Sequence, residues 1–69
     1  MNPQAKHYEI WWTNSNELDA NNPRMCQCFD YYDALAVWDV MAKRFCYVVL
    51  YKVLENGDCV ADRVYKNLP

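Results

Sequence analysis

The chain has 69 residues, of which 54% are apolar and 16% aromatic, and nine acids against seven bases give a net charge of −2. This length predicts one domain over residues 1–69, with flexible ends at 1–6 and 67–69. The near balance of charges argues against nucleic-acid and membrane surfaces, and no apolar run approaches the roughly 18 residues of a membrane span. Because the N-terminus lacks a secretory apolar segment, we expect a cytoplasmic protein whose four cysteines are reduced.

The first expected strand, at 7–13, is dense in Tyr, Ile, Trp and Thr. An Asn-rich loop over 14–23 follows, and 24–29 could form a second strand that pairs with the first. Trp11 and Trp12 are adjacent in the strand and must point to opposite faces of the sheet. We expect the wholly apolar set to face the helix, namely Tyr8, Ile10 and Trp12. The other set then lies on the open face, namely His7, Glu9, Trp11 and Thr13.

The helix is the clearest expected element. Asp30 is a suitable N-cap, Asp33 lies in the first turn, and Lys43 and Arg44 fall in the last turn. A period of 3.6 residues gathers one apolar stripe, formed by Tyr31, Ala34, Leu35, Trp38, Met41, Ala42 and Phe45. The opposite side holds Tyr32, Asp33, Ala36, Asp39, Val40, Lys43 and Arg44, among which Asp39 and Lys43 form a favourable i,i+4 pair.

Two further strands are expected at 46–54 and 59–66, joined at Asn56-Gly57, a strong hairpin signal. A two-residue turn would place Val53 opposite Val60 and Val49 opposite Val64, whereas a three-residue loop with a bulge would shift the register by one. The expected fold is therefore α+β, with one helix packed on a three- or four-stranded antiparallel sheet in the order β(β)αββ.

Both faces of this sheet carry large apolar side chains, and one helix covers only one face. Either long side chains and the polar loop fold over the second face, or that face binds a partner. The candidate partner-binding residues come from three elements of the expected fold: Trp11 and Glu9 on the first strand, Tyr32 and Val40 on the outer side of the helix, and Tyr65 on the last strand.

Candidate chemistry is sparse, so we expect no enzyme, no cofactor and no metal. The residues that could ligate zinc are Cys26, Cys28, Cys46, Cys59 and His7, but Cys-x-Cys is a poor knuckle spacing, and Cys46 and Cys59 are expected to be buried. His7 has no nucleophile linked to it by a motif, and Asp30 and Asp39 are explained by capping and by pairing. Gly57 is the one glycine, which excludes a glycine-rich phosphate loop.

The motif Phe-Asp-Tyr-Tyr-Asp-Ala-Leu at 29–35, then a helix, then Tyr-Val-Val-Leu-Tyr-Lys-Val at 47–53 and Asn56-Gly57, resembles small proteins of phages and mobile elements in layout. Several anti-CRISPR proteins are similar in size and layout. The resemblance implies a non-enzymatic inhibitor that binds a bacterial defence complex in the host cytoplasm, and it transfers no functional residue. Two alternatives remain: a structural homo-oligomer, such as a homodimer, that uses an open sheet face or edge, and a small RNA-binding module that stacks bases on aromatic rings.

Overall fold

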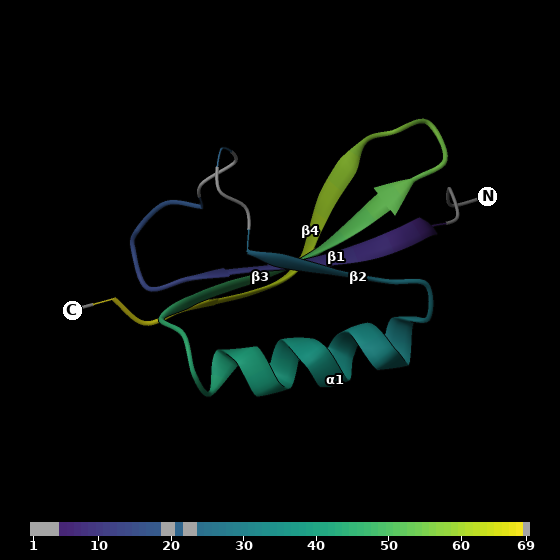
Figure 1. The fold of residues 1–69 in the computed structure, drawn as a ribbon. Coiled ribbons are helices and arrows are strands. Elements are labelled where there is room, and N and C mark those ends of the chain that lie inside the picture. Colours follow the sequence, from purple (N-terminus) through teal and green to yellow (C-terminus); the bar gives the residue numbers. More distant parts are fainter. Residues whose placement is uncertain (1–4, 19–20, 22–23, 69) are drawn as a thin grey trace.

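One helix lies across one face of a four-stranded antiparallel sheet in the computed structural model (Figure 1). The structure describes residues 5–18, 21 and 24–68. The strands lie in the order β2-β1-β3-β4, with bounds β1 Ala5–Thr13, β2 Met25–Cys28, β3 Tyr47–Leu54 and β4 Cys59–Lys66, and helix α1 (Tyr31–Ala42) joins β2 to β3. The expected α+β class is confirmed, and the region that could have been loop or strand forms β2.

The hydrophobic core lies between α1 and the central strands β1 and β3. Ile10 of β1 is fully buried, and its register neighbours are Cys26 of β2 and Leu50 of β3. Ala34 of α1 and Val48 of β3 complete the buried cluster, against which Tyr8 and Trp12 pack. Tyr8, Ile10 and Trp12 therefore face the helix, as the apolar set of this strand predicts.

The start of the helix and its buried side are those that the sequence predicts. Asp30 is the N-cap, and its carboxylate accepts the Tyr32 N–H at 3.4 Å. Every residue of the predicted apolar stripe is buried or half-buried, and every residue of the predicted outer side is exposed. The helix ends at Ala42, so Lys43 is the C-cap and Arg44 lies beyond the last turn in which both were expected. Lys43 Nζ lies 3.3 Å from Asp39, which confirms the i,i+4 pair.

The β3–β4 hairpin uses the three-residue alternative, so the two-residue register is wrong near the turn. The Gly57 N–H donates to the Leu54 carbonyl, the Leu54 N–H donates to the Asp58 carbonyl, and Gly57 has a φ of 91°. Glycine adopts this left-handed conformation without a Cβ clash. Consequently Val53 lies opposite Cys59 rather than Val60.

A β-bulge at Asp62 restores the predicted register farther along the hairpin. Tyr51 pairs with Ala61 and Leu50 with Arg63, which leaves Asp62 as the extra residue, and beyond it Val49 pairs with Val64 as predicted. Asp62 and Arg63, the two residues at the bulge, both contact the helix. Tyr31 Oη donates to Asp62 at 2.8 Å, which raises the pKa of Tyr31, and the Arg63 guanidinium lies 5.2 Å from the centre of the Trp38 ring.

The described residues at both chain ends take part in strand pairing. Residues 1–4 and 69 lie outside the described residues. Ala5 and Lys6 belong to β1, which begins two residues before the predicted start at His7. The Asn67 N–H donates to the Cys46 carbonyl at 2.7 Å and so continues the β3–β4 pairing by one step.

Trp38→Ala tests the helix phase. Trp38 packs against the core on one side and beneath Arg63 on the other, so its truncation should destabilise the fold by about 3–5 kcal/mol, measured by chemical denaturation. Trp38→Phe keeps an aromatic ring and removes an indole N–H that is buried with no partner among the described residues. This variant should therefore lose much less of the free energy of unfolding than Trp38→Ala does. Equal stability of Trp38→Ala and the unaltered protein would show that the phase is wrong.

Candidate functional site

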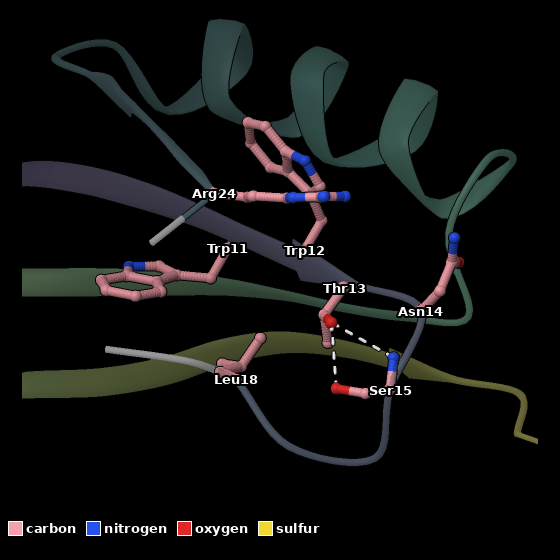
Figure 2. A pocket seen from close by; sticks show the side chains of 7 residues that line it. All are labelled: Trp11, Trp12, Thr13, Asn14, Ser15, Leu18 and Arg24. Carbon is pink, nitrogen blue, oxygen red and sulfur yellow. Dashed lines mark hydrogen bonds between the residues drawn. The ribbon is translucent and has the colours of Figure 1, made fainter. Parts of the chain in front are cut away.

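The two adjacent tryptophans point to opposite faces of the sheet (Figure 2). Trp12 turns toward α1, where its ring lies 6.1 Å from the Phe45 ring and packs on the main core. Trp11 lies on the other face, beside Leu18 of the loop that follows β1. The face assignment made from the sequence is confirmed. The expectation that Trp11 is uncovered is wrong in degree, because both tryptophans are half-buried.

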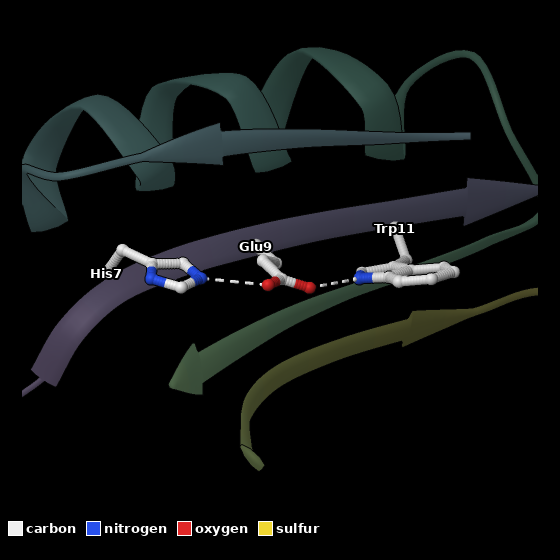
Figure 3. A network of polar contacts seen from close by, with 3 residues as sticks. All are labelled: His7, Glu9 and Trp11. Atoms are coloured by element: carbon white, nitrogen blue, oxygen red, sulfur yellow. Dashed lines mark hydrogen bonds and ion pairs between the residues drawn. The ribbon is translucent and has the colours of Figure 1, made fainter. Parts of the chain in front are cut away.

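Trp11 is held in place by a row of polar contacts along β1 (Figure 3). The indole Nε1–H donates to Glu9 Oε1 at 3.0 Å, and His7 Nε2 lies 2.8 Å from Glu9 Oε2. The three side chains are two residues apart in sequence and therefore share one sheet face. One carboxylate oxygen of Glu9 therefore contacts His7, and the other orients the Trp11 ring.

A mostly apolar hollow of about 330 Å³ adjoins this row. We call it the Trp11 hollow, and its walls are Glu9, Trp11, Leu18, Tyr51 and Cys59. Burial raises the pKa of the Tyr51 hydroxyl, with smaller contributions from Tyr47 and Cys59. The hollow lies on the side of the sheet opposite the helix.

The sheet around the Trp11 hollow buries a second, smaller set of apolar groups. Val49 lies between Trp11 and Val64 in the register and is only 1% exposed, although it points away from the helix. Val53 is also buried on this side. The second face is thus partly covered by its own long side chains and by the loop, which is one of the two alternatives that the sequence left open.

A larger depression of about 510 Å³ lies at the end of β1. It is lined by Trp11, Trp12, Thr13, Asn14, Ser15, Leu18 and Arg24. The loop start is tied down on both sides, because Asn14 Oδ1 accepts the Cys46 N–H at 3.2 Å and the Trp12 N–H donates to the Arg24 carbonyl at 3.2 Å. Leu18 of this loop lines both this depression and the Trp11 hollow.

The five candidate partner-binding residues do not form one surface. Trp11 and Glu9 line the Trp11 hollow. Tyr32 and Val40 are exposed by 78% and 48% on the outer side of α1, across the molecule from that hollow. Tyr65 packs beneath the helix against the core, opposite Val48. The sequence did not single out Leu18 or Tyr51, which also line the Trp11 hollow. Leu18 lies in a loop without apolar periodicity, and the neighbours of Tyr51 depend on a hairpin register that the sequence left open.

The cysteines are free thiols spread over the sheet. Cys26 and Cys28 share the helix face, as their spacing predicts, opposite Ile10 and Tyr8. Cys59 is exposed at the turn end of the hairpin, so the expectation that it is buried is wrong. Among the described residues no three His, Cys, Asp or Glu side chains gather as a metal site. Burial, with added repulsion from Cys26, raises the pKa of the Cys28 thiol, which lowers the fraction present as the reactive thiolate.

No protein-family model, curated protein or solved structure matches this chain. Within residues 5–18, 21 and 24–68, no helix is long and apolar enough to cross a membrane.

Glu9→Ala tests the row that holds Trp11. The substitution leaves the Trp11 indole N–H and the His7 ring without their acceptor, so we expect a loss of about 1–2 kcal/mol in the free energy of unfolding. Glu55→Ala removes the same charge from an exposed turn residue and should change stability by less than about 0.5 kcal/mol. Equal effects of the two variants in urea denaturation would contradict a structural role of the Glu9 contacts.

Proposed function

We propose that the protein is a non-enzymatic binding module that holds a partner protein through the Trp11 hollow. The observation that carries this proposal is a tryptophan fixed by its own hydrogen bond beside an apolar hollow, on the sheet face that no helix covers. Tryptophan is among the residues that most often dominate binding energy at protein interfaces. A ring that is already oriented loses little conformational freedom when it binds.

The chemistry of the hollow favours an apolar anchor on the partner. Glu9 is the acidic residue of its wall, and both of its carboxylate oxygens already accept bonds from Trp11 and His7. Leu18 and Tyr51 supply further apolar wall beside Trp11 and Glu9. A partner side chain of the Leu, Met or aromatic kind would therefore gain burial here without leaving a charge unpaired.

The partner class follows from the layout of the chain. One helix on a small antiparallel sheet in a chain of 69 residues resembles small phage-encoded inhibitors, so a bacterial defence complex is the first class of partner to test. The absence of enzymatic activity is part of the proposal.

Trp11→Ala should weaken binding of the partner by about 2 kcal/mol or more, which is roughly a thirtyfold increase in Kd. The experiment uses the tagged chain to capture a partner from bacterial lysate and then measures affinity by calorimetry below the melting temperature. Tyr32→Ala removes an exposed aromatic ring from the outer side of α1 and serves as the matched control, with unchanged affinity.

The fold is monitored separately with Trp12→Ala, which empties a site in the main core and should destabilise far more than Trp11→Ala. If Tyr32→Ala abolishes capture and Trp11→Ala does not, the binding surface is the helix and the proposal fails. If Trp11→Ala binds normally and melts like Trp12→Ala, Trp11 acts only in packing.

A further inference from the structure

Strand β4 is a long, uncovered edge of the sheet. Its neighbour on one side is β3, and no strand lies on its other side in the described chain. Seven of its eight residues are exposed. The helix packs mainly on β1, β2 and β3, and it reaches β4 through Tyr31 at Asp62 and Trp38 at Arg63. The other edge, β2, has only four residues. Figure 1 shows the hairpin end of β4 rising away from α1.

The backbone groups on this outer edge follow from the bonds at the two ends of the hairpin. The Asp58 carbonyl and the Asn67 N–H both point inward, toward β3. Alternation from Asp58 turns Cys59 and Ala61 outward, and alternation from Asn67 turns Lys66 and Val64 outward. The extra residue at the bulge makes this outward pattern symmetric about the peptide bond between Asp62 and Arg63.

We propose that β4 pairs antiparallel with β4 of a second copy of this chain, with a two-fold axis at the Asp62–Arg63 bond, so that the two sheets join into one. In this register Ala61 lies opposite Val64 of the second copy, and Cys59 lies opposite Lys66. All four residues turn their N–H and carbonyl groups outward, so each pair can exchange backbone hydrogen bonds.

The bulge also brings the side chains into a self-complementary arrangement. Asp62 and Arg63 both point toward the helix side, as their contacts with Tyr31 and Trp38 show. Without the bulge, neighbours in sequence would point to opposite faces and could not oppose each other across a two-fold axis. With it, Asp62 of each copy opposes Arg63 of the other, in a non-hydrogen-bonded pair where side chains are closest.

The exposed valines of β4 are also compatible with the proposed β4–β4 register. Val60 and Val64 are 49% and 55% exposed, which places both among the exposed large hydrophobic residues of the structure. In the dimer Val60 lies opposite Tyr65 of the second copy on the helix side, and Val64 lies opposite Ala61 on the other face. The two valines of each copy gain neighbours that the single chain does not provide.

Charges on an edge strand usually prevent pairing with other strands. Here the two central charges, Asp62 and Arg63, have opposite sign. An unrelated strand would leave them without oppositely charged partners, whereas a second copy places an opposite charge across from each. The occupant of this edge is therefore the chain itself, and the contact closes by two-fold symmetry without leaving a free β4 edge.

The test is sedimentation equilibrium with charge variants. The unaltered protein should show twice the 8.2 kDa chain mass. Arg63→Asp and Asp62→Arg each place like charges across the axis, so each alone should dimerise at least about tenfold more weakly. A mixture of the two variants restores both opposite pairs and should form a heterodimer. Lys43→Asp and Asp39→Arg change the net charge equally on exposed helix positions and should remain dimers.

Amide hydrogen exchange of the unaltered protein provides a readout that does not depend on the folding of a variant. The N–H groups of Ala61 and Val64 should lose protection on dilution, while that of Ile10 stays protected. A protein that is monomeric at millimolar concentration, or a dimer in which these two amides exchange freely, would overturn the proposal. Trp11→Ala should remain a dimer, so failure of the Trp11 hollow as a binding site and failure of this edge are distinguished.

Discussion

The alternation of side chains along β1 is the constraint on which the rest of the structure depends. This strand is bonded on both sides, to β2 and to β3, so its register sets the faces of both neighbours. Ile10 enters the main core, while Trp11 and Glu9 organise the opposite face. A slip of one residue would exchange these two sets and place Glu9 in the core without a partner, which makes the register strongly specified.

A chain this short buries only a modest fraction of its surface, so the second face of the sheet contributes to stability as well. Val49 illustrates this, because it is as buried as the core residues yet belongs to the side that the helix does not cover. The groups that cover it, Trp11 among them, therefore have a structural part beside any part in binding. The separation between core and binding surface that the sequence suggested is less sharp than strand alternation alone implies.

The helix was predictable in nearly every respect, because a 3.6-residue period and an N-cap are local properties that packing against any sheet preserves. The capping by Asp30 and the burial of Ala34 needed no tertiary information. The position of Leu18 could not be predicted locally, because it belongs to a loop that Asn14 ties to Cys46, just before β3. Exposure of Cys59 likewise follows from a register that a turn type decides, and Asn56-Gly57 is compatible with more than one turn.

The turn and the bulge in the β3–β4 hairpin are best understood as one device. The three-residue loop at Gly57 shifts the pairing by one residue relative to a two-residue turn, and the extra residue at Asp62 shifts it back. If the first shift were left uncorrected, Val64 would oppose Val48 beneath the helix, and Arg63 would oppose Val49 on the other face.

The bulge instead sets Tyr65 beside Val48 and turns Arg63 onto the Trp38 ring. The extra residue that restores the register toward β3 thus gives the outer edge of β4 a symmetric pattern of backbone groups and charges. A local irregularity of the hairpin therefore links the packing of the monomer to the dimer that we propose.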